Sequence, residues 1–161
     1  MDTIRLLLAH SDRRVSNQIE VAVLDVCYDQ AAVQSTRIVR LDEFVRKGSV
    51  WDFDLIVVGT EHLFADRTQQ AGATLEDVAE GIRSIRSQSS APVIALTNSK
   101  QAREVLMEAG AHAVLTFPFT SEALKAEVRP LLDLTSCAET AQTNRWAALG
   151  SFFKGLQKAK A

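Results

Sequence analysis

The pattern of hydrophobic positions along the chain changes repeatedly between continuous runs and helical spacing. Ile4–Ala9 is a short, uninterrupted apolar run, which is typical of a buried parallel strand. Ser11 or Asp12 can then cap a helix. The apolar positions of that helix recur at helical spacing and are Val15, Ile19, Ala22, Val23 and Val26.

Four further strand–helix units follow the same plan. Asp77 lies three residues after Thr74, the arrangement of a capping box, so a helix is expected to begin there and run through Ser87. Gly110 predicts a helix C-terminus, and Pro130 predicts a kink or an end. The other expected strands are Thr36–Leu41, Leu55–Val58, Pro92–Leu96 and Ala113–Thr116, and the other expected helices are Asp42–Arg46, Lys100–Ala109 and Ser121–Arg129. Because parallel neighbours need crossover helices, these units predict an α/β fold with a doubly wound, five-stranded parallel sheet.

The composition fits one soluble domain with an appendage. Of 161 residues, 47% are hydrophobic, which allows one sizeable core. The net charge of −2 gives no general attraction to nucleic acid, and Arg37 and Arg40 flank a strand without a recognition helix. No signal peptide is expected at the N-terminus, and no apolar run approaches the about 18 residues of a membrane span. The sequence therefore predicts a cytoplasmic protein that binds no nucleic acid.

Residue types that bind metals or perform catalysis are scattered. Cys27 and Cys137 lie far apart and outside any C-x-x-C spacing, so neither a metal site nor a disulfide is expected. His62 and His112 have no ligand spacing around them. The segment from His10 to Asp12 contains the residue types of a hydrolase triad, but consecutive residues cannot form its geometry. The sequence predicts no enzyme, no cofactor and no metal ion.

The segment from Glu108 to Phe119 reads E-A-G-A-H-A-V-L-T-F-P-F. It closely resembles the end of a two-component receiver domain, where the pattern is E-A-G-A-x-x-x-L-x-K-P-F. Three earlier apolar segments, Ile4–Ala9, Asp54–Val58 and Ala91–Thr97, resemble the first, third and fourth receiver strands. The resemblance covers roughly residues 3–134. It implies the flavodoxin-like strand order of response-regulator receivers, with the site outside the carboxyl ends of the strands.

At the positions where receivers perform phosphorylation, the resemblance implies losses. The matches to the two magnesium-binding acids are His10 and Ser11, which are poor ligands for a hard cation. The match to the phosphoacceptor aspartate is Gly59, and the match to the fifth-strand lysine is Phe117. Phosphoryl transfer depends on positioned charge and a metal ion. The chain therefore resembles a receiver that has lost its phosphorylation chemistry.

Two receiver positions are retained in this chain. Thr97 matches the fourth-strand hydroxyl, and Pro118 follows the lysine position as it does in the family. The aromatic switch position of the family holds Val114. Neither Thr97 nor Pro118 can perform chemistry alone.

Neighbouring acids could replace part of the lost charge. Asp12, Glu61 and Asp66 lie close in sequence to the vacated positions. A one-residue shift would bring Asp12 into the acidic site, but there would still be no acceptor, and a helix N-cap is its preferred role. Phe117 is expected to fill the space of the lysine and the phosphoryl group. The alternative is a partner-docking patch that it forms with Phe119.

The end of the chain predicts a separate helical segment. Residues 1–134 form the receiver-like domain, 135–143 read as a linker, and 144–161 form a tail. The tail has apolar residues at a three-four spacing together with several basic residues, as in a basic amphipathic helix. The apolar residues are Trp146, Leu149, Phe152, Phe153 and Leu156, and the basic residues are Arg145, Lys154, Lys158 and Lys160.

Several roles remain open for this tail. It could fold back on its own domain, pair with its copy, enter a groove on another protein or, least favourably, lie on a membrane surface. A lone receiver offers no obvious groove for it. A symmetric homodimer through the tail is the simplest closed arrangement, and we expect it.

These observations predict a non-phosphorylatable pseudoreceiver that acts as a protein–protein interaction module in bacterial signal transduction. The resemblance suggests that a signalling partner binds the face formed by the fourth helix, fifth strand and fifth helix. The residues of that face are Arg103, Met107, His112, Glu122 and Lys125. The alternative function is a small-molecule or nucleotide sensor that uses the space over Gly59, since glycine permits close approach of a ligand. No Gly-rich phosphate loop supports that alternative.

Overall fold

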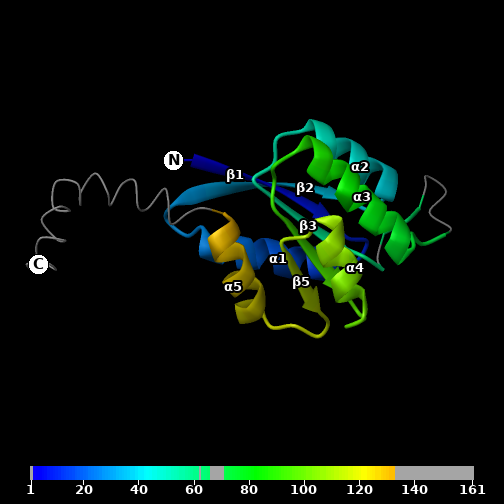
Figure 1. The fold of residues 1–161 in the computed structure, drawn as a ribbon. Coiled ribbons are helices and arrows are strands. Elements are labelled where there is room, and N and C mark those ends of the chain that lie inside the picture. Colours follow the sequence, from blue (N-terminus) through cyan, green and yellow to red (C-terminus); the bar gives the residue numbers. More distant parts are fainter. Residues whose placement is uncertain (1, 62, 66–70, 133–161) are drawn as a thin grey trace, which may run out of the picture.

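A single parallel sheet forms the centre of the molecule (Figure 1). The computed structural model describes residues 2–61, 63–65 and 71–132. The strands are β1 (Asp2–Ala9), β2 (Ala31–Ile38), β3 (Leu55–Gly59), β4 (Val93–Thr97) and β5 (Ala113–Thr116). Their order is β2-β1-β3-β4-β5, and every pairing is parallel. This order confirms the predicted doubly wound, flavodoxin-like sheet.

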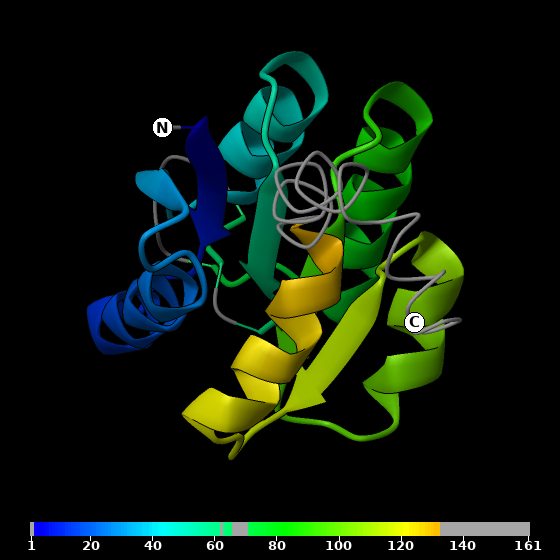
Figure 2. The same cartoon turned by 90° about the vertical axis from the view of Figure 1, so that its left-hand side faces the viewer.

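The crossover helices cover the two faces of the sheet (Figures 1 and 2). They are α1 (Arg13–Val26), α2 (Leu41–Val50), α3 (Leu75–Gln88), α4 (Ala102–Ala109) and α5 (Ser121–Leu131). Side chains of α1 and α5 pack on one face, and those of α2, α3 and α4 pack on the other. Strands buried on both sides explain why β3 and β4 are apolar apart from the terminal Thr97.

The predicted helix ends are confirmed at three places. Asp12 caps α1, where its Oδ1 accepts a hydrogen bond from the Arg14 N–H at 2.9 Å. Thr74 and Asp77 form a capping box at the start of α3. Gly110 ends α4 with φ of 117°, a left-handed conformation that glycine adopts without steric cost.

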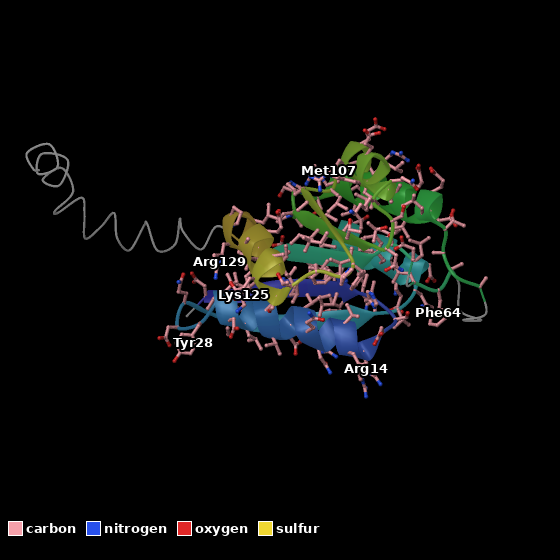
Figure 3. The ribbon with its side chains drawn as sticks, turned by 90° about the horizontal axis from the view of Figure 1, so that it is seen from below. Arg14, Tyr28, Phe64, Met107, Lys125 and Arg129 are labelled. Atoms are coloured by element: carbon pink, nitrogen blue, oxygen red, sulfur yellow. The ribbon has the colours of Figure 1, made fainter. Side chains whose placement is uncertain are left out.

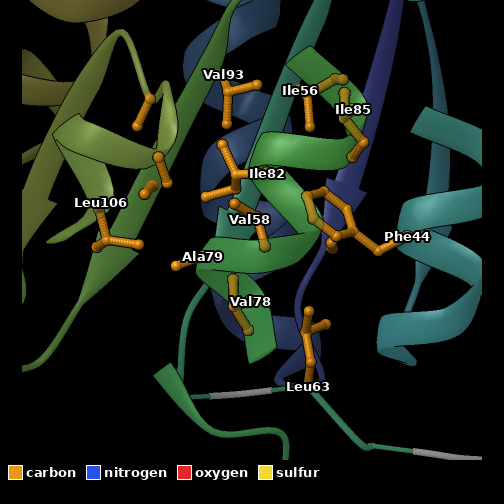
Figure 4. Close-up of a cluster of buried hydrophobic side chains, with 14 of the residues drawn as sticks. Phe44, Ile56, Val58, Leu63, Val78, Ala79, Ile82, Ile85, Val93 and Leu106 are labelled. Carbon is orange, nitrogen blue, oxygen red and sulfur yellow. The ribbon is translucent and has the colours of Figure 1, made fainter. Parts of the chain in front are cut away.

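The larger of the two cores lies between the sheet and α2, α3 and α4. Figure 4 shows its central residues, with Phe44 of α2 and Ile82 of α3 packed over Ile56 and Val58 of β3. The second core lies between the sheet and α1 and α5, where Ile19 and Leu124 are fully buried or nearly so. At about 1.5–3 kcal/mol for each buried large side chain, these two layers supply the main favourable term in folding.

An ion pair joins the two helices of the second layer. The Lys125 Nζ of α5 lies 2.8 Å from Asp25 Oδ2 of α1 and 3.4 Å from Glu122 Oε1. The hydrogen bond to Asp25 is the main reason that the pKa of Lys125 is raised, and Glu122 adds to the effect. Lys125 therefore faces α1 rather than α4.

Several expected elements have different bounds in the structure, among them the second strand, the second helix and the last helix. The second strand is Ala31–Ile38, not Thr36–Leu41, because β2 pairs with β1 from Asp2↔Ala31 to Ala9↔Ile38 and Leu41 already belongs to α2. β2 is an edge strand, so its alternation of exposed and half-buried residues is a weak signal. The expected helix Asp42–Arg46 is the middle of the longer α2. Pro130 does not end α5, which continues to Leu131.

Two basic residues within the expected second strand are held in ion pairs. Arg37 Nη2 lies 3.3 Å from Glu20 Oε1, and Arg40 contacts Asp42 and Glu43 at 3.1 and 3.2 Å. Cys27 is buried and free, whereas Cys137 lies outside the described residues. None of the helices in the described part of the chain has the length and apolar character needed to span a bilayer.

Candidate functional site at the carboxyl ends of the strands

The residues at the carboxyl ends of β1, β3, β4 and β5 meet at one edge of the sheet. His10 follows β1, Gly59 ends β3, Thr97 ends β4, and Phe117 follows β5. In doubly wound sheets this edge is the usual place for a binding site. The structure thus brings together four of the residues that the sequence singled out.

The side chain of His10 fills the space next to Gly59. A Cβ placed on Gly59 would lie 2.3 Å from His10 Cδ2 and 3.0 Å from Nε2, closer than real Cβ contacts allow. His10 is only 4% exposed, and its Nδ1 accepts a hydrogen bond from the Asp12 N–H at 2.9 Å. The glycine at position 59 therefore makes room for the imidazole of His10, and the two residues pack as a pair.

Phe117 closes the same space from the side of β5. Its ring makes an edge contact with the His10 ring at a centroid distance of 6.3 Å and lies 4.8 Å from the ring of Phe119. Both phenylalanines are half-buried against the second core. The Phe117–Pro118 peptide bond is cis, and the Phe117 N–H donates to the Thr97 carbonyl at 2.9 Å. Apolar packing thus stands where the resemblance placed a lysine.

Glu61 provides negative charge at this edge. Its carboxylate accepts hydrogen bonds from the Thr97 hydroxyl at 2.5 Å and from the Thr60 hydroxyl at 2.6 Å. It also accepts from the Asn98 backbone N–H at 3.1 and 3.2 Å. Thr97 and Thr60 are fully buried, so the Glu61 carboxylate satisfies hydroxyls that water does not reach. This carboxylate ties the end of β3 to the end of β4.

The sequence indicates that Glu61 lies close to the vacated position, but it does not indicate which groups the Glu61 carboxylate contacts. Thr60 and Asn98 were missed altogether. Their signal was adjacency: Thr60 directly follows Gly59, and Asn98 directly follows Thr97. An acid two residues after one strand can reach donors at the end of the neighbouring strand only because the two strands pair in register, Gly59 opposite Leu96.

The residues at the receiver's metal position do not fit a magnesium ion. Ser11 is exposed, and Asp12 turns to the α1 N-terminus, where it acts as the cap. His10 is buried as an imidazole whose Nδ1 already accepts a backbone hydrogen bond. Magnesium requires several oxygen ligands, usually with carboxylates among them. Among the residues that the structure describes, no group of three or more His, Cys, Asp or Glu side chains is placed to hold a metal ion.

The suggested partner face is only partly continuous. Arg103 and Met107 lie on α4, and Arg103 Nη1 donates to the carbonyl of Val114 at 3.3 Å. Met107 is 40% exposed (Figure 3). His112 accepts the Val93 N–H at its Nδ1, and burial together with the charge of Arg86 lowers its pKa.

Glu122 and Lys125, on α5, form an ion pair, with Lys125 facing α1. The apolar tail residues Trp146, Leu149, Phe152, Phe153 and Leu156 lie outside the described residues, as do His62 and Asp66.

Comparison with known proteins supports the fold. No protein-family model matches the chain, and no curated protein matches it significantly. Among solved structures, the chain is similar to the receiver domain of sensor histidine kinase PA1611 from Pseudomonas aeruginosa, with 19% identity, a TM-score of 0.59, and coverage of 81% of this chain and 98% of that one. A CheY-like receiver from Methanospirillum hungatei has 15% identity and a TM-score of 0.61, with coverage of 82% and 95%.

A third neighbour comes from another cellular process. It is CpaE2 of Sinorhizobium meliloti, assigned to pilus assembly, with 15% identity, a TM-score of 0.59, and coverage of 80% and 99%. One fold therefore serves in a sensor kinase and in a pilus assembly protein, so function has to be argued from the site. The described chain has the flavodoxin-like fold of receiver domains, at low sequence identity to them.

Proposed function

We propose that this chain is a receiver-like signalling module that accepts no phosphoryl group and acts through protein–protein contacts. The receiver fold supports a role in signalling of the two-component kind. One observation carries the proposal further: Gly59 has no side chain to phosphorylate, and the His10 ring occupies the space that an acceptor carboxylate would need. A receiver of this kind is a binding module and not an enzyme.

The contacts of Glu61 support the same conclusion. Thr97 and Asn98 are donors that could hold an incoming anion, but both already donate to the Glu61 carboxylate. Charge-assisted hydrogen bonds of this kind are stronger than those between neutral groups. The site therefore supplies its own anion. A sensor for a small molecule or nucleotide would have to displace Glu61, His10 or Phe117, and no contact among the described residues favours that alternative.

Phosphorylation can be tested directly on the purified full chain. We expect that incubation with acetyl phosphate and magnesium adds no phosphoryl mass in intact-protein mass spectrometry. Beryllofluoride with magnesium should leave the backbone NMR spectrum unchanged. A receiver that retains its acceptor aspartate, treated in parallel, is the positive control. A stoichiometric phosphoryl adduct would overturn the proposal, and chemical-shift changes with a panel of nucleotides around Gly59 would favour the sensor.

The signalling partner is proposed to bind on the α4 side of the molecule. Met107 is an exposed apolar residue there, with Arg103 one turn before it. Once a partner is isolated from the native cell, Met107→Glu should weaken its binding to the purified chain by at least tenfold. Val50→Glu, at a more exposed apolar position at the end of α2, is the control. Equal affinities for the two variants would remove α4 from the interface.

A further inference from the structure

Helix α1 exposes an apolar stripe to solvent. Val21, Leu24 and Tyr28 are 56%, 46% and 74% exposed. They are spaced three and four residues apart, which places them on one side of the helix and its C-terminal turn. The buried residues Ile19 and Val23 face the sheet. Single exposed apolar residues are common, but a stripe of three neighbours on one helix marks a surface to be covered.

This stripe lies where the described chain ends. Lys125 of α5 contacts Asp25 at 2.8 Å, so the two helices are side by side. Leu132 is buried in the same core cluster as Val26 and Cys27, at the C-terminal end of α1. Figure 3 shows Tyr28 at the same end of the molecule as Lys125 and Arg129, with Arg14 at the other end of α1. The chain therefore continues from α5 beside the end of the stripe.

The segment that follows has the chemistry to cover the stripe. Residues 144–156 contain Trp146, Leu149, Phe153 and Leu156 at helical spacing, with Arg145 before them, Lys154 among them, and Lys158 and Lys160 following. Asp25 and Asp29 are acidic residues beside the stripe, and the side chain of Asp25 is 57% exposed despite its ion pair. Apolar residues would thus meet apolar residues, and basic residues would meet acidic ones.

The intervening chain is long enough to reach. Residues 133–143 can extend over up to about 36 Å, at about 3.3 Å per residue. The 14-residue α1 is about 21 Å long, at about 1.5 Å per residue. A short connection also gives its own target an effective concentration in the millimolar range. This exceeds the concentration of a second copy at micromolar protein.

We propose that residues 144–156 bind the Val21–Leu24–Tyr28 stripe of α1 in the same chain. The sequence alone favoured a second copy as the partner of the tail. The stripe next to the end of α5 and the reach of residues 133–143 favour the chain's own domain instead. The tail then covers apolar surface of its own domain and gives α1 an outer layer.

Trp146 is the reporter for the test, which uses the full chain. Trp51→Phe removes the other tryptophan and keeps an aromatic ring beside Phe53. In this background we expect the Trp146 emission to be shielded from acrylamide. Leu24→Gln and Tyr28→Gln should each raise the quenching constant severalfold, because glutamine removes the apolar contact. At position 24, which lies within α1, glutamine also keeps the helix propensity. Val50→Gln, on an exposed apolar residue of α2, should leave quenching unchanged.

Sedimentation of the same samples distinguishes the possible occupants. The proposal expects a monomer whose Trp146 shielding is constant across the micromolar range. Shielding that appears only as a dimer forms would assign the tail to a second copy, and shielding only with anionic lipid vesicles would assign it to a membrane surface. Both results would overturn the proposal. Full exposure of Trp146, or shielding that neither Leu24→Gln nor Tyr28→Gln changes, would overturn it as well.

Discussion

The imidazole of His10 stands against the α-carbon of Gly59, so closely that a Cβ at position 59 would lie 2.3 Å from His10 Cδ2. His10 directly follows β1 and Gly59 ends the adjacent parallel strand β3, with Ala9 paired to Val58 just before them. A receiver places its acceptor side chain at the end of β3. Here the neighbouring strand fills that position with a ring.

The pair predicts a coupling between two substitutions. Gly59→Ala should lower the free energy of unfolding by about 1–3 kcal/mol, because the new methyl group overlaps a buried ring. In a His10→Ala background, the same change should cost much less, so the double-mutant cycle in urea melts should show a clear coupling energy. Gly72→Ala is the control, since among the described residues a Cβ there meets only the Leu63 carbonyl oxygen, at 3.9 Å. Additive effects of the two substitutions would contradict the packing described.

The carboxylate of Glu61 predicts a second coupling. Glu61→Ala leaves the buried Thr97 hydroxyl and the Asn98 N–H without their acceptor, and we expect a loss of about 1–3 kcal/mol. Thr97→Val removes one donor, so Glu61→Ala should cost less in that background. Unfolding in urea measures both. Glu108→Ala, at an exposed position on α4, should change stability by less than about 0.5 kcal/mol. If Glu61→Ala matches that control, the link between β3 and β4 contributes nothing to stability.

At position 117, we expect the free energy of unfolding to depend on the apolar size of the side chain, and not to rise when the lysine of receivers is put back. Because the side chain is half-buried against His10 and Phe119, Phe117→Lys should lower the free energy of unfolding by about 1–3 kcal/mol. Phe117→Leu keeps most of the apolar area and should cost less. Thermal and urea melts compare the two. Parent-like stability of Phe117→Lys would show that the ring does not fill the site, and would favour a docking patch made with Phe119.

His112 predicts a pH dependence of stability. Burial, with a contribution from Arg86, lowers its pKa in the folded state, so the folded chain binds the proton less readily than the unfolded chain. The neutral ring accepts the Val93 N–H, and protonation at Nδ1 removes that acceptor. Its stabilising contribution is therefore present above the unfolded pKa of about 6.5 and is lost as the pH falls through the lower folded value.

His112→Asn tests this dependence, since its side-chain oxygen can still accept and does not titrate. The parent should lose stability relative to His112→Asn between about pH 7 and pH 5, measured by urea melts at each pH. Parallel curves for the two proteins over this range would remove His112 as the titrating group.

Periodicity was most informative where an element is long and its ends carry caps. Thr74 and Asp77 marked the start of α3 because each side chain bonds the other's backbone, a purely local arrangement. β2 was misplaced because an edge strand with one partner has little apolar character to mark it. Its position is set by pairing with β1, which depends on residues far away in the sequence.

For the site, the sequence predicted only which receiver residues are replaced, and not the contacts that the replacing residues make. Position-by-position resemblance to receivers pointed to His10, Gly59 and Phe117 because each replaces a residue with known chemistry. The role of Glu61 could not be inferred in that way, since it depends on three donors from two different strand ends. The reason for the glycine was equally hidden: it is explained by the ring of a residue 49 positions away, which only the pairing of β1 with β3 brings close.

The attachment of Glu61 to the backbone has a consequence for timing. An acyl phosphate limits the lifetime of the active state of a receiver, because its hydrolysis returns the receiver to the unphosphorylated state. The Glu61 carboxylate is part of the chain and is not removed by hydrolysis. The contacts that it makes between the ends of β3 and β4 are therefore neither formed by phosphorylation nor lost with time. Under the proposed function, the strength of the signal then depends on how much of the protein is present and free to bind, and not on phosphoryl turnover at this site.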